Sequence, residues 1–324
     1  MKTVWLVIPC YNEEEVIAET AKRTSELMYG LIKKNKISES SRIAFVNDGS
    51  TDRTLELIQR FCGEDKIFAC INLSRNRGHQ NALLAGLMTA KEYADAVISL
   101  DADLQDDIGV IEKFIDEFSG GSDIVYGVRA DRKTDSRIKR ATAEGFYKFM
   151  RLMGVDIVFN HADYRLMSKR AIEGLAQFDE VNTFLRGIVP QIGYPSSIVE
   201  YSREKRFAGK SKYPFKKMCS FAMEGITSFS VRPIKMALAL GMLSFLVSIF
   251  MLLYCIVEHS LGNTVSGWAS LGVSIWAIGG LQLLMIGVVG EYVGKIYLET
   301  KHRPKYIIES VILDGEKHDG RKEA

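Results

Sequence analysis

Two aspartates, Asp101 and Asp103, carry the clearest chemical signal in this chain, because they directly follow an apolar run at residues 96–100. Side chains alternate along an extended strand, so both carboxylates are expected on one side, at the carboxyl end of a buried strand. In open α/β sheets, that edge is where ligands bind. Paired carboxylates there can hold a hard divalent cation, which commonly also binds substrate phosphates. The alternative is a solvated acidic turn, and the surrounding elements decide between the two.

Strands and helices are expected to alternate through residues 1–130. Apolar runs typical of buried strands occupy residues 4–8, 43–46, 67–73, 96–100 and 124–126. Amphipathic patterns typical of helices occupy residues 14–34, 51–61, 81–93 and 108–118. This alternation predicts an α/β, Rossmann-like domain with a mostly parallel sheet that helices cover on both faces. No G-x-G-x-x-G sequence follows a strand, so a dinucleotide site of the dehydrogenase type has no local support.

Polar loops follow three of the other expected strands and should meet the aspartate pair at one edge of the sheet. The loop at residues 9–14 offers the Tyr11 ring and several polar groups to a base or a ribose. In the second loop, Asp48 could accept hydrogen bonds from a pyrimidine edge or a ribose hydroxyl. Asp52 could be no more than the N-cap of the helix that follows. The third loop, at residues 74–79, contains Arg75.

Two uncharged runs, at residues 236–257 and 268–290, are each long enough to cross a bilayer as a helix. They contain 22 and 23 residues, which corresponds to about 33 Å of helix each. The segment between them contains no Lys or Arg, and basic residues flank the pair on its outer sides. The positive-inside rule therefore predicts a hairpin with both chain ends in the cytoplasm. A pair of buried core helices is the alternative.

Basic residues are concentrated in two segments outside these runs. Residues 135–152 show an amphipathic pattern that suits a helix on an anionic membrane surface or an ordinary surface helix, and the nearby apolar runs favour the first. Residues 203–217 contain seven Lys or Arg. A net charge of only +2 gives no reason to expect a nucleic-acid partner. The expected parts are a cytoplasmic catalytic domain at 1–230, a transmembrane hairpin at 231–295, and a cytoplasmic tail at 296–324 that frays after Glu309.

Nine short segments are specific when they occur together in this order. They are PCYNEE at residues 9–14, VNDGS at 46–50, LSRN at 73–76, DADLQD at 101–106, DYRLM at 163–167, RFAGKSKY at 206–213, EGITSFS at 224–230, GEYVG at 290–294 and RPKY at 303–306. With them the chain resembles glycosyltransferase family 2, and within it the polyprenyl-phosphate glycosyltransferases related to dolichol-phosphate mannose synthase. It is most similar to bacterial bactoprenol glucosyltransferases with two C-terminal membrane helices.

The resemblance implies a nucleotide-sugar-binding domain of the GT-A type and transfer of a sugar, with inversion, from a nucleotide diphosphate donor to undecaprenyl (polyprenyl) phosphate. It implies a multi-pass protein of the bacterial inner membrane that works at the cytoplasmic face. Mg²⁺ or Mn²⁺ is the implied cofactor, with Asp101, Asp103 and Gln105 as ligands. The implied catalytic residues are Asp103 and Asp163. The residues implied for donor binding are Pro9, Tyr11, Asn12, Glu13, Asp48, Arg75, Asp101 and Asp103. Those implied for the acceptor phosphate are Arg137, Arg140, Arg206, Ser211 and Lys212.

The resemblance leaves the donor sugar and the role of Asp163 open. Glucose from UDP-glucose is the favoured donor sugar, with UDP-N-acetylglucosamine, GDP-mannose and a modified arabinose donor as alternatives, because residues 77–81 depart from the family pattern. Asp163 matches the family's candidate base, yet a phosphate monoester is largely ionised at pH 7 and needs little deprotonation. Asp163 could instead orient the acceptor or stabilise positive charge on the sugar.

Two other classes of protein are disfavoured. A translocase needs a polar path through the membrane, and the two apolar runs contain no charge. A non-catalytic membrane adaptor would not need the complete set of acidic motifs. Glycines in the second run permit close helix contacts, so a homo-oligomer is expected.

Overall fold

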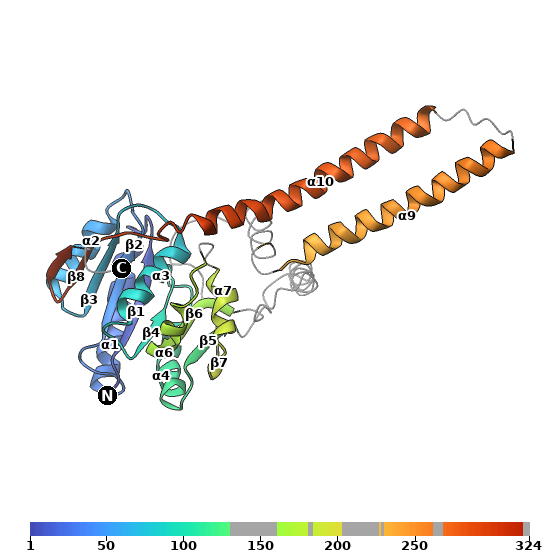
Figure 1. Cartoon of the computed structure of the whole chain (residues 1–324). Helices are drawn as coiled ribbons and strands as arrows, with labels where there is room; N and C mark the ends of the chain where they lie inside the picture. The colour runs from blue at the N-terminus through green and yellow to red at the C-terminus, as the bar shows by residue number, and fades with distance from the viewer. Residues whose placement is uncertain (130–160, 181–183, 203–226, 228–229, 262–267, 320–324) are drawn as a thin grey trace. The chain divides into compact units, whose positions relative to one another are not determined.

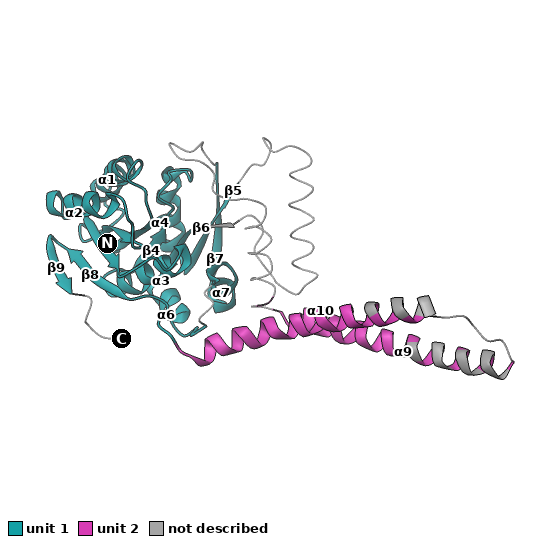
Figure 2. Ribbon diagram, turned by 90° about the horizontal axis from the view of Figure 1, so that it is seen from above, with its two compact units in different colours: residues 1–147, 157–213, 303–324 teal, residues 148–156, 214–302 magenta. Residues whose placement is uncertain are grey.

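The computed structural model describes residues 1–129, 161–180, 184–202, 227, 230–261 and 268–319 (Figure 1). These residues fall into two units (Figure 2). The first unit contains the described residues up to 202 together with residues 303–319, and the second contains the described residues from 227 to 302. The helix predicted at residues 135–152 lies outside the described residues.

A mixed sheet forms the centre of the first unit. Its described strands are β1 (Val4–Cys10), β2 (Arg42–Asn47), β3 (Phe68–Leu73), β4 (Ala96–Ser99), β5 (Ile124–Arg129), β6 (His161–Ser168), β7 (Ser196–Tyr201), β8 (Ile308–Leu313) and β9 (Glu316–Asp319). They lie in the order β7-β5-β6-β4-β1-β2-β3-β8-β9. The strands β1 to β4 pair in parallel, and every residue of β1, β3 and β4 is buried. Burial on both faces explains why these strands are uninterrupted apolar runs.

The sheet is mixed: β1 to β4 are parallel, as is β5 with β7, but the prediction of a mostly parallel sheet is wrong for the remaining pairs. β6 is antiparallel to both β4 and β5, and β8 is antiparallel to β3 and β9. β6 was not among the predicted strands. It includes the buried charged residues Asp163 and Arg165, so it lacks the apolar run that identified the others.

Helices follow the central strands as predicted. They are α1 (Ile17–Lys33), α2 (Thr54–Glu64), α3 (His79–Ala90), the short η1 (Ile108–Val110) with α4 (Ile111–Ser119), and then α6 (Lys169–Leu175), α7 (Leu185–Ile188) and η2 (Val189–Ile192) between β6 and β7. α3 lies very close to the sheet at Gly86, where a Cβ would stand 2.3 Å from Val7 Cγ1 and 2.8 Å from Val46 Cγ2. This contact fixes α3 against β1 and β2, and with it the first residues of α3.

The C-terminal segment returns to the first unit and extends its sheet. β8 pairs with β3, the Asn72 side-chain amide donates to Glu309 Oε2 at 2.8 Å, and Arg42 Nη2 lies 2.9 Å from Asp314 Oδ1. The prediction that the chain frays after Glu309 is therefore wrong as far as residue 319. Residues 303–319 belong with the N-terminal residues, not to a separate tail.

Two long apolar helices, α9 (Arg232–Ser260) and α10 (Trp268–Thr300), account for most of the described second unit. Large apolar side chains on both are exposed, with Leu238 at 69% and Leu283 at 72%. One segment of the described chain, Ala277–Thr300, is long and apolar enough to cross a membrane, by length and composition. The predicted hairpin of two membrane spans stays a prediction.

Candidate functional site

The loops after β1 and β2 are tied together by hydrogen bonds between backbone and side chains. The Asn12 N–H donates to Ser50 Oγ at 3.1 Å, and Asn12 Oδ1 accepts from the Thr51 N–H at 2.9 Å. The Glu13 N–H donates to Thr54 Oγ1 at 2.9 Å. Asn12 adopts a left-handed backbone conformation, with φ of 54°, which these bonds stabilise. They hold the Tyr11 ring, which is 43% exposed, in a fixed loop beside the buried end of β1 that contains Pro9.

Asp48 fastens the loop after β3 to the loop after β2. Its two carboxylate oxygens accept from the backbone N–H groups of Arg77 at 2.6 Å and Gly78 at 2.9 Å. Burial raises the pKa of Asp48 above its ordinary value, and these two donors oppose the shift. The next residue, Gly49, has φ of +64°, and a Cβ there would lie 2.5 Å from Asn76 N. Asp48 thus positions the loop that contains the exposed Arg75, and its predicted contact with a base or ribose stays a prediction.

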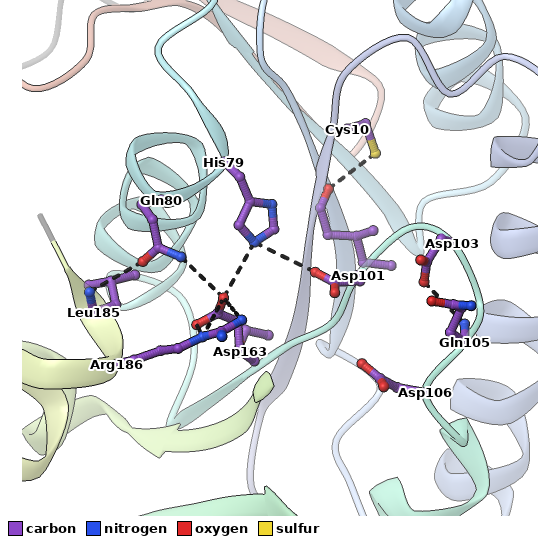
Figure 3. Close-up of polar contacts among 12 residues, drawn as sticks. Cys10, His79, Gln80, Asp101, Asp103, Gln105, Asp106, Asp163, Leu185 and Arg186 are labelled. Atoms are coloured by element: carbon purple, nitrogen blue, oxygen red, sulfur yellow. Dashed lines mark hydrogen bonds and ion pairs between the residues drawn. The ribbon is translucent and has the colours of Figure 1, made fainter. Parts of the chain in front are cut away.

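The aspartate pair lies where the sequence predicts, directly after β4, but its two side chains have different surroundings (Figure 3). Asp101 Oδ1 is 3.6 Å from His79 Nε2. Asp103 Oδ1 accepts from the Gln105 N–H at 3.1 Å. Leu104, which follows Asp103, is buried and has a left-handed backbone with φ of 53°. Burial and the nearby carboxylates raise the pKa of Asp101 above its ordinary value, while His79 opposes the shift.

A divalent cation suits the chemistry of these donors. Carboxylate and amide oxygens are the ligands that Mg²⁺ and Mn²⁺ prefer. Burial is the main cause of the raised pKa of Asp101, and the nearby carboxylates add to it, so a cation bound there would favour the ionised form. Among the described residues, however, no three His, Cys, Asp or Glu side chains gather closely enough to hold a metal ion. The set Asp101, Asp103 and Gln105 therefore stays a prediction.

Asp163 is buried in β6 and is surrounded by donors. Its side chain is only 6% exposed, and its Oδ1 lies 2.6 Å from Nη2 of the fully buried Arg165. Its Oδ2 accepts from Arg186 Nη2 at 3.0 Å and from the Gln80 side-chain amide at 3.1 Å. Burial alone would raise the pKa of Asp163, but the two guanidinium groups outweigh it and hold that pKa well below the ordinary value. Asp163 is therefore a carboxylate throughout the neutral range.

His79 lies between the two carboxylates. Its Nε2 is 3.6 Å from Asp101 Oδ1 and 3.9 Å from Asp163 Oδ2, and its side chain is 43% exposed (Figure 3). The backbone just before it has a left-handed glycine, Gly78, at φ of +84°, which starts α3 at this point. His79 is thus within ion-pair distance of both carboxylates.

Four residues of this cluster were absent from the predicted site. They are His79, Gln80, Arg165 and Arg186. Arg165 stands two residues after Asp163, so it would have been placed on the same side of the sheet if a strand had been predicted there. His79 and Gln80 belong to the segment 77–81 that departs from the family pattern. Arg186 stands in a short helix without any motif that would have indicated it.

Five predicted residues cannot be placed in this cluster. The acceptor-phosphate residues all lie outside the described residues, and they are Arg137, Arg140, Arg206, Ser211 and Lys212.

An α/β domain whose loops gather polar and acidic groups at the carboxyl edge of the central strands is typical of enzymes that bind nucleotides. Residues 5–175 match the model of the glycosyl transferase family 2. The uncharacterized glycosyltransferase YkoT of Bacillus subtilis is 52% identical over 304 residues, which cover 94% of this chain and 90% of that protein. The bactoprenol glucosyl transferase of Shigella phage SfV is 42% identical over 310 residues, which cover 94% of this chain and 97% of that protein.

A solved mannosyltransferase from Pyrobaculum calidifontis, in complex with GDP-Man and Mn²⁺, is similar at 15% identity with a TM-score of 0.48, and the match covers 90% of this chain and 87% of that one. The sequence matches decide the assignment: the chain belongs to glycosyl transferase family 2, with a GT-A-like α/β fold and a mixed sheet.

Proposed function

We propose that this protein transfers a sugar, with inversion, from a nucleotide diphosphate donor to polyprenyl phosphate, and that the donor is UDP-glucose. The observation that carries the proposal is the meeting of the loops after β1 to β4 at one edge of the sheet, with Asp101 and Asp163 on either side of His79. The relatives named bactoprenol glucosyl transferase, which match nearly their whole length, support the lipid acceptor and the glucosyl group.

The donor would bind at the loops after β1, β2 and β3. Tyr11 is exposed enough to stack on a base, and Asn12 and Glu13 lie beside it in a loop that is fixed by hydrogen bonds. Arg75 would contact the phosphates from the loop that Asp48 holds in place. Rigid loops of this kind lower the entropy cost of binding and of orienting the sugar.

Asp101, Asp103 and Gln105 would hold Mg²⁺ or Mn²⁺. When bound, the ion would neutralise the charge that develops on the leaving diphosphate. The acceptor phosphate is already largely ionised at neutral pH, so it can attack without a strong base. Arg137, Arg140, Arg206, Ser211 and Lys212 would hold that phosphate, which suits the planar donor fork of arginine.

The reaction would take place at the cytoplasmic face of a bacterial inner membrane, with α9 and α10 as a transmembrane hairpin. Exposed apolar side chains along both helices support this arrangement, because a lipid environment would bury them. A homo-oligomer would give the two helices additional contacts within the membrane.

The test is transfer of label to lipid by membranes that contain the full chain. Undecaprenyl phosphate is incubated separately with radiolabelled UDP-glucose, UDP-N-acetylglucosamine and GDP-mannose. We expect labelled lipid from UDP-glucose and none after addition of a chelator. Asp103→Ala should abolish the product, whereas Asp116→Ala, which removes an exposed carboxylate of α4, should not. Label from another donor would replace the sugar in the proposal, and no label from any donor would refute the activity.

A further inference from the structure

The donors around Asp163 leave its carboxylate little capacity to act on a substrate. Arg165 Nη2 occupies Oδ1 at 2.6 Å, while Arg186 Nη2 and the Gln80 amide occupy Oδ2 at 3.0 Å and 3.1 Å. Arg186 Nε adds a contact of 3.3 Å to each oxygen. A carboxylate offers about four lone-pair positions. With its positions taken by three side chains, Asp163 is placed to hold those side chains in a fixed arrangement.

The two arginines differ in what they can reach. Arg165 and Asp163 are both buried, with 2% and 6% of their side chains exposed, and together they make a neutral pair. Arg186 adds a second guanidinium to the same carboxylate, so these three side chains together carry one net positive charge. The Arg186 side chain is 35% exposed. The extra positive charge of the cluster therefore lies on the side that a ligand can approach.

The short helix that carries Arg186 is held at its first residue, Leu185. Gln80 Oε1 accepts from the Leu185 N–H at 3.2 Å, while the amide of the same Gln80 side chain donates to Asp163. Arg165 Nη1 donates to the Leu185 carbonyl at 3.4 Å. Gln80 thus connects α3, β6 and α7 through one side chain (Figure 3). A guanidinium held from both the helix and the carboxylate is already oriented before a ligand arrives, which reduces the cost of binding.

We propose that Arg186 binds a phosphate group of a substrate, and that Asp163 and Gln80 are positioning residues that aim its guanidinium. The inference rests on the proposed function for the identity of the substrates. Arginine suits this task because its planar fork matches the oxygens of a phosphate and keeps its charge at every physiological pH. The phosphate comes either from the diphosphate of the donor or from the polyprenyl phosphate acceptor, and the experiment separates these two sources.

The experiment uses the full chain in detergent or nanodiscs with Arg186→Gln, Arg186→Lys and Gln80→Met, and with Arg170→Gln as the control. Arg170 is an exposed arginine that pairs with Asp123. Steady-state rates give the KM for each substrate and kcat, while calorimetry measures binding of UDP and of inorganic diphosphate in the presence of Mg²⁺. A hydrogen bond to a charged group corresponds to a change of about 10- to 150-fold.

We expect Arg186→Gln to weaken one phosphate-bearing substrate by about 10- to 150-fold and the other by less than about threefold. A weaker Kd for UDP and diphosphate assigns Arg186 to the donor. A higher acceptor KM with unchanged UDP binding assigns it to the acceptor. Arg186→Lys should recover part of the loss, and Gln80→Met should weaken the same substrate to a smaller extent. The control should match the wild type.

Unchanged KM values and unchanged UDP binding in Arg186→Gln, with a lower Tm, would refute the proposal and leave a structural role only. Failure of the wild type to transfer any sugar would refute the proposed function. The diphosphate calorimetry would still test Arg186 in that case, because it needs no turnover.

Discussion

The buried pair formed by Arg165 and Asp163 predicts a large effect of Arg165→Met on stability. Both side chains are nearly inaccessible, and their charged atoms are 2.6 Å apart. Removing one partner of a buried pair typically costs about 3–5 kcal/mol, because the remaining charge is left in a poorly solvated place. Asp163 keeps its bonds to Arg186 and Gln80, so we expect the lower end, about 3 kcal/mol. At about 2–4 °C per kcal/mol for a domain of this size, the Tm should fall by about 6–12 °C.

The assay is thermal unfolding of the full chain in detergent, compared with two further variants. Arg170→Met removes an arginine that is 60% exposed from its pair with Asp123, and it should cost about 1 kcal/mol or less. Arg165→Met/Asp163→Leu removes both buried charges, so it should be less destabilised than the sum of the two single variants, by about 0.5–3 kcal/mol. A Tm of Arg165→Met within 2 °C of the wild type, or strict additivity in the double variant, would show that the buried pair does not contribute as described.

Three further outcomes follow from the same geometry. Because the pKa of Asp163 is held below its ordinary value, its carboxylate stays ionised from pH 5.5 to 8.5. The ratio of kcat/KM between Asp163→Asn and wild type should therefore be constant over that range. A ratio that rises more than about tenfold with pH would instead indicate that Asp163 acts as a general base on an acceptor phosphate that is not yet ionised. In a background without native cysteines, Ser260→Cys should react with an impermeant thiol reagent outside intact cells and Ser211→Cys only after lysis; the reverse pattern would exclude a cytoplasmic site. Gly49→Ala should destabilise by about 1–3 kcal/mol, since its φ of +64° is left-handed and its Cβ would lie 2.5 Å from a backbone nitrogen. A Tm equal to that of the wild type in the same melting assay would contradict this.

The elements that sequence predicts well are those with a local apolar signal. The runs at residues 4–8 and 96–100 became β1 and β4 with ends shifted by two residues at most, because strands buried on both faces consist of consecutive apolar residues. β6 has no such signal, since it contains the buried pair Asp163 and Arg165. A short, polar tail gives no local sign of β8, whose partner β3 is remote: the bonded Asn72 and Glu309 are 237 positions apart.

The residues of the candidate site also divide into those with a local sequence signal and those without one. The position of Asp101 could be predicted because it follows a strand directly, and strand ends define one edge of the sheet. The contacts of Asp163 with Gln80 and Arg186 join residues that are 83 and 23 positions apart, and no spacing rule links them. The role of Asp48 in holding the next loop was also missed, because an acidic residue after a strand looks the same whether it faces a ligand or a backbone N–H.

The loop after β3 is held from two sides, by Asp48 after β2 and by the residue just before β8. The C-terminal segment therefore helps to position this loop. On one side, Asp48 holds that loop through the backbone N–H groups of Arg77 and Gly78. On the other side, the Ser74 N–H donates to the carbonyl of residue 307 at 3.0 Å, next to the start of β8. β8 lies beyond α10 in the chain, so the apolar helices are inserted within the first unit's sequence, not appended to it. The chain therefore returns after its apolar helices to pair β8 with β3 and to supply the carbonyl that the Ser74 N–H contacts, next to the loop that bears Arg75.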